Sequence, residues 1–405
     1  MIYLNNAATS YPKPKTVLEA ASGCLTAMPA EAGRSVGNFS DDRSADAFTS
    51  ENIVQRCKLQ LSMLFHCAPD ELYLTSGATE SANLVIAGLP MQGIHVIVTA
   101  TEHNSILRPL YNHPDHPEIT CVPCDPDGRV DPECIQKAVR PNTKYVFVNH
   151  CSNVTGYVQD MAALWDLTRK YHLLLIADVS QSAGCAKIDT DGGFADILIF
   201  TGHKNLFGAS GIGGMYIRRD IPLRPVKTGG TGYDSAVIRL PEDYRDFEPG
   251  TPNYPGIAAM AAGAKFIMDT GGAGGPDIVC DRMSGQHCYS GIELVQKQLH
   301  QTRKYMVERL KAMPGVTVYN ANTDQFSGPV ISLNIRGLSP KDTGYILLEN
   351  YGIVTRTGLH CSPLIHQYLG APEGTVRLSF TIMTPREDIE AALAAVEEIS
   401  RAAAP

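Results

Sequence analysis

The sequence has no apolar run long enough to cross a bilayer, which takes about 18 residues or more. Leu173–Ala177 is short, and the apolar stretch Gly256–Met268 is interrupted by Lys265. Met1–Leu4 leads directly into polar Asn5, and no basic region precedes an apolar one, so we recognise no export signal. We therefore expect a cytoplasmic protein that does not associate with membranes.

An excess of basic residues is also lacking. The chain contains 34 Lys and Arg against 42 Asp and Glu, which gives a formal charge of −8 and excludes a general nucleic-acid binder. Hydrophobic residues make up 44% of the 405 residues, enough to bury a large core. This length predicts one large domain and a smaller one.

The 11 cysteines do not form a pattern typical of disulfides or metal sites. Their number is odd and they are scattered over a long chain, so a disulfide framework is not expected. Cys121 and Cys124 have the spacing of a zinc ligand pair, but no second pair follows at a suitable distance, and we expect no metal. Most of the cysteines are interpreted as small apolar core residues.

Short apolar runs alternate with helical patterns from about residue 70 onward. The predicted strands are Glu71–Thr75, His95–Thr99, Glu118–Pro123, Tyr145–Asn149, Leu173–Ala177, Ile197–Phe200 and Gly214–Ile217. The predicted helices are Thr79–Ala87, Asn104–Tyr111, Pro132–Val139 and Met161–Tyr171. This alternation predicts an α/β fold with a mostly parallel, helix-covered sheet.

The second half of the chain has a different organisation. Pro and Gly residues mark an irregular segment, after which we predict a helix over Tyr289–Ala312, strands over Thr317–Tyr319, Val330–Ile335 and Val376–Phe380, and a terminal helix over Pro385–Ala404. We predict a large domain over residues 15–255. Residues 1–14 and 256–405 are predicted to form an N-terminal arm and a smaller α+β domain that carries Cys361. Gly271–Gly275 is interpreted as a loop or linker.

Three polar clusters stand where predicted strands end, which is where open α/β sheets bind their ligands. Thr75–Glu80 opens a helix, and its free N–H groups, with Gly77 allowing close approach, suit a phosphate, although an ordinary helix cap would look the same. Asp178 ends an apolar strand, where an unpaired carboxylate would be costly. Lys204 ends another strand and could form an imine with a carbonyl compound.

Together, an anion seat, a strand-end carboxylate and a strand-end lysine describe a site for pyridoxal 5′-phosphate. In this interpretation the phosphate lies on the helix start. Asp178 keeps the pyridine nitrogen protonated, and Lys204 binds the cofactor covalently.

The chain resembles the class V branch of the fold-type I pyridoxal-phosphate enzymes, and within it the cysteine desulfurases, closest to the short-loop desulfurases and selenocysteine lyases. The matching stretches run in family order over nearly the whole chain. They are Tyr3–Thr9, Thr75–Ser81, Thr101–His103, Asn149–Asn153, Ala177–Gln181, Thr201–Lys204, Gly250–Asn253, Arg356–Cys361 and Arg377–Phe380.

This resemblance implies cofactor contacts for each cluster. His103 would stack on the cofactor ring and move protons, which suits a side chain that titrates near neutrality. Asp178 would pair with the pyridinium nitrogen and Lys204 would carry the cofactor. The implied contacts to the phosphate, the ring oxygen or the substrate come from Gly77, Ala78, Thr79, Asn153, Gln181, Thr201 and His203.

The resemblance also implies a substrate clamp and a partner subunit. Arg377 would bind the substrate carboxylate through a bidentate fork, with Arg356 close by. Arg34 is assigned to the rim of the active site, with a solvated loop arginine as the alternative. Thr251 would reach the phosphate of the other subunit's cofactor, which implies a homodimer with shared sites.

Cys361 distinguishes a desulfurase from an ordinary aminotransferase. In the implied mechanism its thiolate attacks the sulfur of L-cysteine, becomes a persulfide and leaves alanine as the product. Gly358 and Pro363 favour an irregular loop around Cys361, and a protonated His360 could lower the pKa of its thiol. The alternative is a buried cysteine in a turn.

Only a short segment separates Cys361 from Arg377, which resembles the desulfurase group that passes sulfur to an acceptor protein. Asn5 stands where many relatives have Asp, and we expect no change in the chemistry. Residues 271–290, with Cys280 and Cys288, depart from the family pattern and are interpreted as a linker and helix start.

Other functions stay open at this point. A selenocysteine lyase would use the same lysine and ring chemistry. A class V transaminase, lyase or epimerase would make Cys361 incidental. A non-catalytic cofactor-binding subunit would have no need for a carboxylate clamp beside an imine-forming lysine, so it is disfavoured.

Overall fold

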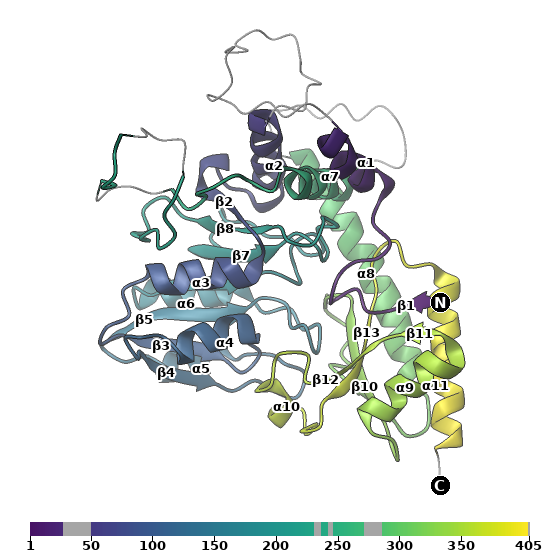
Figure 1. Ribbon diagram of the computed structural model, residues 1–405. Helices are drawn as coiled ribbons and strands as arrows, with labels where there is room; N and C mark the ends of the chain where they lie inside the picture. The colour runs from purple at the N-terminus through teal and green to yellow at the C-terminus, as the bar shows by residue number, and fades with distance from the viewer. Residues whose placement is uncertain (27–49, 231–235, 242–245, 271–285, 404–405) are drawn as a thin grey trace.

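The computed structural model describes residues 1–26, 50–230, 236–241, 246–270 and 286–403, arranged around two main sheets and one two-stranded pair (Figure 1). The larger sheet has seven strands in the order β2-β8-β7-β6-β5-β3-β4. They are β2 (Leu72–Thr75), β3 (His95–Thr99), β4 (Glu118–Val122), β5 (Thr143–Asn149), β6 (Leu174–Asp178), β7 (Ile197–Thr201) and β8 (Gly213–Ile217).

The predicted α/β sheet is confirmed, with one antiparallel strand. Neighbouring strands from β4 to β7 pair in parallel, whereas β8 is antiparallel to both β7 and β2. The strands β2, β3, β5, β6 and β7 therefore all point their carboxyl ends to one edge of the sheet. The amino end of β8 lies at the same edge, and every polar cluster predicted from the sequence falls there.

Alternating side chains of the strands build two cores, one on each face of the large sheet. In β5, Val146 and Val148 belong to one cluster of buried residues, while Tyr145 and Phe147 belong to the other. The second cluster includes residues of α3 (Ala78–Gly88) and α4 (Asn104–Tyr111), which lie together in front of the sheet in Figure 1. The first includes residues of α5 (Pro132–Ala138) and α6 (Met161–Lys170).

The smaller sheet has the antiparallel order β12-β13-β10-β9. Its strands are β9 (Val316–Tyr319), β10 (Val330–Ile335), β12 (Arg356–Gly358) and β13 (Thr375–Ser379). The remaining helices are α1 (Lys15–Thr26), α2 (Ser50–Phe65), α7 (Tyr254–Thr270), α8 (Gln286–Lys311), α9 (Pro340–Tyr351), α10 (Ile365–Tyr368) and α11 (Arg386–Ala402). A 3-10 turn, Pro69–Glu71, precedes β2.

Residues 1–14 form an extended arm that connects the two sheets. Its strand β1 (Ile2–Tyr3) pairs in parallel with β11 (Ile353–Val354). Asn6 donates a hydrogen bond from Nδ2 to the carbonyl of Ser379 at 3.0 Å, on the side of the small sheet. Gln181 donates from Nε2 to the carbonyl of Ala7 at 3.0 Å, on the side of the large sheet.

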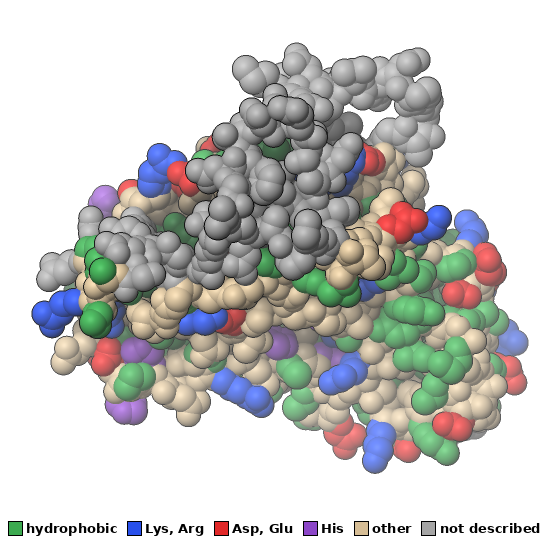
Figure 2. All heavy atoms as spheres, turned by 45° about the horizontal axis from the view of Figure 1, so that its top comes forward, with side chains coloured by type: hydrophobic (Ala, Val, Ile, Leu, Met, Phe, Trp, Pro, Cys, Tyr) green, Lys and Arg blue, Asp and Glu red, His purple; other side chains and the backbone are tan. Residues whose placement is uncertain are grey.

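On the face shown in Figure 2, acidic and basic side chains of the described residues are interspersed, without a basic stripe. Among the described residues, no helix combines the length and the apolar character that crossing a membrane requires.

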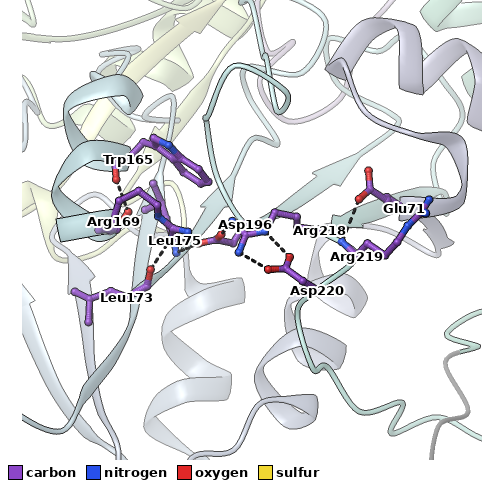
Figure 3. A network of polar contacts seen from close by, with 10 residues as sticks. Glu71, Trp165, Arg169, Leu173, Leu175, Asp196, Arg218, Arg219 and Asp220 are labelled. Carbon is purple, nitrogen blue, oxygen red and sulfur yellow. Dashed lines mark hydrogen bonds and ion pairs between the residues drawn. The ribbon is translucent and has the colours of Figure 1, made fainter. Parts of the chain in front are cut away.

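A charged network stabilises the edge of the large sheet opposite to the polar clusters (Figure 3). The side chain of Asp196, directly before β7, is fully buried and forms ion pairs with Arg169, at 2.6 Å, and with Arg218. The same carboxylate accepts a hydrogen bond from the N–H of Leu175 at 2.7 Å. The Arg169 guanidinium also stacks on Trp165, 4.1 Å from the ring centroid.

Replacing Asp196 with Ala should lower the free energy of unfolding by about 3 kcal/mol, because two arginines and one buried N–H lose their partner. Urea denaturation followed by circular dichroism measures this change. Asp220→Ala is the matched control. Asp220 pairs with Arg218 but its side chain is 68% exposed, so we expect a loss of less than about 1 kcal/mol. Equal losses in the two variants would contradict a structural role specific to Asp196.

Candidate active site

A cavity of about 360 Å³ lies at the edge of the large sheet where the polar clusters meet. The arm contributes Ala7 and Ala8, and the segment between β12 and β13 contributes Cys361. Of the residues predicted for the site, those that line the cavity are Gly77, Ala78, Thr79, His103, Asn153, Asp178, Gln181, Thr201, His203, Lys204, Arg356, Cys361 and Arg377. The structure therefore brings together residues from the N-terminal arm, the large sheet and the small sheet, with Ala7 and Arg377 lining one cavity.

The first cluster forms the start of α3 beside the cavity. Gly77 precedes the helix with φ 147°, a backbone conformation that favours glycine. The N–H groups of Ala78 and Thr79 belong to the first turn, where a helix has no carbonyl to offer them. A Cβ on Gly77 would lie 3.8 Å from the hydroxyl oxygen of Thr201, so this hydroxyl faces the helix start. These donors suit a phosphate.

Asp178 and Lys204 end neighbouring strands and face the same cavity. Asp178, 5% exposed, is the last residue of β6, and its carboxylate accepts a hydrogen bond from the N–H of Ser180 at 2.9 Å. Lys204 follows β7. Burial lowers the pKa of Lys204 to about 8, and the nearby Asp178 opposes part of this shift. A lysine with this pKa is neutral often enough at pH 7 to act as a nucleophile or base.

Four donors from the arm converge on the carbonyl oxygen of His203, the residue directly before Lys204. The donors are Thr9 Oγ1 at 3.1 Å, Ser10 N–H at 3.0 Å, Ser10 Oγ at 3.2 Å and Lys13 Nζ at 3.0 Å. Burial lowers the pKa of Lys13 to about 8. The peptide that orients Lys204 is therefore held by the N-terminal arm and not by the sheet, which ends at Thr201.

The prediction that His103 titrates near neutrality is wrong for this cavity. Burial and the positive charge of Lys204 lower the pKa of His103 to about 4. Its Nδ1 accepts a hydrogen bond from the N–H of Ser105 at 3.0 Å, which caps α4. The ring is therefore neutral at pH 7, with its proton on Nε2.

Two arginines lie side by side on neighbouring strands of the small sheet. Arg356 of β12 and Arg377 of β13 are direct partners in the register. Arg377 is only 4% exposed and donates to the backbone carbonyl of Asn153 at 2.9 Å, while its Nε has no partner among the described residues. Burial lowers the pKa of Arg377 to about 10, so it stays charged at pH 7 and can bind a carboxylate.

The loop that carries Cys361 is held by Asn153. The Nδ2 of Asn153 donates to the carbonyl of His360 at 2.7 Å, and its Oδ1 accepts from the hydroxyl of Ser362 at 2.7 Å. The N–H of Asn104 donates to the carbonyl of Cys361 at 2.8 Å. The implied contact of Asn153 with cofactor or substrate stays a prediction, because this amide already clamps the loop.

A protonated His360 is not available to lower the pKa of the Cys361 thiol. Burial, together with the charge of Arg377, lowers the pKa of His360 to about 2, and its Nε2 lies 2.9 Å from the hydroxyl of Thr375. His360 and Cys361 both have left-handed backbones, with φ 51° and 59°. Each such residue costs about 1–2 kcal/mol, which the clamp offsets. Cys361 itself is exposed.

The polar atoms of the cavity fit pyridoxal 5′-phosphate. Within the described part of the chain, the buried atoms of cavity-lining residues that have no partner are Ser180 Oγ, Gln181 Oε1, His203 Nδ1, His360 Nδ1 and Arg377 Nε. Leaving such atoms unpaired costs free energy, so the cavity is built for a polar ligand. An anion seat at α3, a carboxylate and a partly neutral lysine provide the three contacts that this cofactor requires.

Three other sequence predictions have different outcomes. Thr251 lies outside this cavity, in an adjoining one of about 230 Å³ that also contacts Ser76, Glu80 and Gly211. Its role at a partner's cofactor stays a prediction. Arg34 and residues 271–285 fall outside the described residues, so the structure does not test the rim assignment or the linker. Within the described residues, no cluster of His, Cys, Asp and Glu is suited to hold a metal.

Two residues of this site were missed by the sequence analysis. Lys13 lies outside all the matching stretches, and only the fold brings it to His203. Glu102 stands beside His103 in the sequence, fully buried, and accepts from the N–H of Asn149 at 2.7 Å. Burial raises the pKa of Glu102 to about 8, so it is mainly protonated at pH 7. Its place next to His103 was the one available signal.

Known structures and proteins show the same architecture. A cysteine desulfurase from Thermococcus onnurineus, solved in its apo form, aligns with a TM-score of 0.84 and 28% identity over 99% of this chain and 95% of that one. A NifS-like protein aligns with a TM-score of 0.76 at 21% identity, which supports the fold alone.

Sequence comparison gives the same result over the full length. A probable cysteine desulfurase from Pyrococcus abyssi is 29% identical over 98% of this chain and 94% of the relative. A cysteine desulfurase from Haloferax volcanii is 28% identical over 98% of this chain and 89% of the relative. The family described as aminotransferase class-V matches residues 2–274 and 287–392. The resemblance seen in the sequence is confirmed: the chain belongs to the class-V aminotransferase family, whose members depend on pyridoxal 5′-phosphate.

Proposed function

We propose that the protein is a cysteine desulfurase that converts L-cysteine to L-alanine and takes up the sulfur on Cys361. The observation that carries this proposal is that Cys361, an exposed thiol on a loop held by hydrogen bonds to Asn153, lines the same cavity as Lys204 and Arg377. Full-length similarity to cysteine desulfurases supports it.

Different residues of the cavity bind the substrate and transfer protons. Pyridoxal 5′-phosphate, when bound, supplies an electron-withdrawing ring that makes the Cα proton of an amino acid acidic. Arg377, with Arg356 beside it, binds the substrate carboxylate. Lys204, with a pKa near 8, is the base that removes the Cα proton and later returns it. The Nδ1 of His103 accepts a hydrogen bond from the N–H of Ser105, which leaves the proton on Nε2 to be donated to the bound ligand.

Cys361 completes the reaction by nucleophilic attack. Its thiolate attacks the substrate sulfur, the bond between that sulfur and Cβ breaks, and a new S–S bond forms on Cys361. The carbon takes up a proton, so cysteine and one thiol give alanine and one persulfide without an external oxidant. Its position on the rim lets the thiol face both the cavity and the solvent.

The proposal extends to partners. A homodimer with shared active sites is proposed, in which Thr251 reaches the partner's cofactor. A sulfur-acceptor protein then collects the sulfur from Cys361. The exposure of both Thr251 and Cys361 supports these proposals.

The test of the function is alanine formation from L-cysteine with a reductant, measured for the wild type and for Cys361→Ala. We expect the variant to lose at least about 100-fold in alanine formation, because no other described thiol lines the cavity. The variant should bind the cofactor as the wild type does, as seen by absorbance. Activity on selenocysteine alone would favour a selenocysteine lyase. Full activity of the variant on cysteine would assign the protein to another class V reaction.

The low pKa of Lys204 makes cofactor uptake depend on pH. A pKa of about 8 leaves about a tenth of the amine neutral at pH 7, against about one part in three thousand at the ordinary pKa of 10.5. The rate at which cofactor-free protein takes up pyridoxal 5′-phosphate, followed by absorbance, should therefore rise with pH and level off just above pH 8. A rate that still rises tenfold per pH unit at pH 9 would contradict this. Lys204→Arg is the control and should show no covalent uptake.

Lys13 should help to hold the cofactor-binding lysine in place. In Lys13→Met the His203 carbonyl loses a charge-assisted hydrogen bond while the side chain keeps its length, and such a bond contributes about 1.5–3 kcal/mol. We expect about a tenfold faster loss of bound cofactor, measured by absorbance after dilution, with Lys13→Arg intermediate. Lys15→Met is the matched control, because Lys15 is 88% exposed and, in the described part of the chain, pairs with Glu19 alone. Equal rates of cofactor loss for the Lys13 and Lys15 variants would show that the hydrogen bond from Lys13 to the His203 carbonyl does not help to hold the cofactor.

A further inference from the structure

Cys361 also lines a second, larger cavity outside the cofactor site. This groove has a volume of about 940 Å³ and lies along α3 and α4. It shares Thr79, His103, Ser105 and Cys361 with the cofactor cavity. In Figure 1, α3 and α4 lie side by side in front of the large sheet, and the segment between β12 and α10, which carries Cys361, lies next to α4. The thiol thus stands at the junction between an inner and an outer cavity.

The outer groove is positively charged although the chain as a whole carries −8. Arg108 and Arg224 line it, both are exposed, and neither has an ion-pair partner among the described residues. Asp115 is the acidic residue in the described lining, and it lies 3.9 Å from a ring nitrogen of His113. The charge of Arg108 reaches the inner site, because it contributes to the lowered pKa of His103.

The walls of the groove are stiff and partly apolar. Pro90, Pro109, Pro114 and Pro222 restrict the backbone, and Ile86 and Leu89 form an apolar floor. A volume of this size, near the upper end for ligand pockets, accommodates several residues of an extended chain. The two arginines favour carboxylates on that chain.

We propose that this groove is the sulfur-acceptor site and that it binds a protein segment whose cysteine is flanked by acidic residues. The inference rests on the proposed function, since it requires a persulfide on Cys361. The acceptor thiolate attacks the outer sulfur of that persulfide. The S–S bond to Cys361 breaks, a new S–S bond forms on the acceptor, and Cys361 leaves as a thiolate, so no further oxidant or reductant is needed.

The test uses synthetic peptides with one cysteine flanked by Glu, by Lys or by Ser. The enzyme is first loaded with sulfur from L-cysteine, excess substrate is removed, and the persulfide on Cys361 is verified by mass spectrometry. The rate of sulfur transfer to each peptide is then measured. We expect the Glu peptide to react about tenfold faster than the Lys peptide at low salt, and this ratio to fall as salt is added.

The matched variants locate the effect. Arg224→Glu should abolish or reverse the preference for the Glu peptide, whereas Arg336→Glu, an exposed arginine outside the groove lining, should keep it. Arg108 is left intact because its charge acts on His103. Equal rates for the Glu and Lys peptides, or a preference that survives Arg224→Glu, would overturn the proposal.

A second measurement separates peptide binding in the groove from sulfur transfer. Fluorescence anisotropy of labelled peptides with Ser in place of Cys reports binding without sulfur transfer, and the same charge preference and the same loss in Arg224→Glu are expected. If no persulfide forms on Cys361, the proposed function fails before any peptide is added. If the persulfide forms but neither transfer nor binding depends on charge, the acceptor site alone is refuted.

Discussion

The hydrogen bond from Arg377 to the backbone carbonyl of Asn153 joins the two sheets at the cavity, and the geometry of the site depends on it. Arg377 belongs to β13 of the small sheet, whereas Asn153 follows β5 of the large sheet. The same asparagine holds the loop on both sides of Cys361 through its side chain. The substrate clamp, the thiol and the cofactor edge therefore share one fixed point. A shift of one sheet relative to the other would therefore move the substrate clamp away from the cofactor edge.

Stability and function are divided between the two edges of the large sheet. At the amino edge, Asp196 satisfies two arginines and a backbone N–H. At the carboxyl edge, polar atoms are left unpaired and His360 and Cys361 have left-handed backbones. Such strain persists only where the surroundings determine the conformation. The compact core supplies that rigidity. For example, Gly263 of α7 packs against the segment after Lys204, and the carbonyl of Leu206 leaves no space for a Cβ at this position.

The sequence predicted the seven strands of the large sheet and the residues at their ends, because alternation and punctuation are local signals. Helices α1, α2, α7, α9 and α10 were not predicted. The buried face of α7 is made of small residues such as Ala259 and Ala264, which give a weak periodic signal. Lys13 at His203 could not be predicted, because 190 residues separate the two partners. The neutral state of His360 could not be predicted either, because it depends on burial, which a sequence motif does not encode.

The charge state of the cavity follows from its cations. Lys204, Arg356 and Arg377 converge on one space, and the repulsion between positive charges, added to burial, keeps His103 and His360 neutral. Among the described carboxyl groups near the cavity, Glu102 is mainly protonated at pH 7 and Glu80 is paired with Lys227 at 3.0 Å. Of these groups, Asp178 is therefore the one that opposes the cations directly. A cavity with this balance attracts anions. It suits a phosphate and an amino-acid carboxylate bound together.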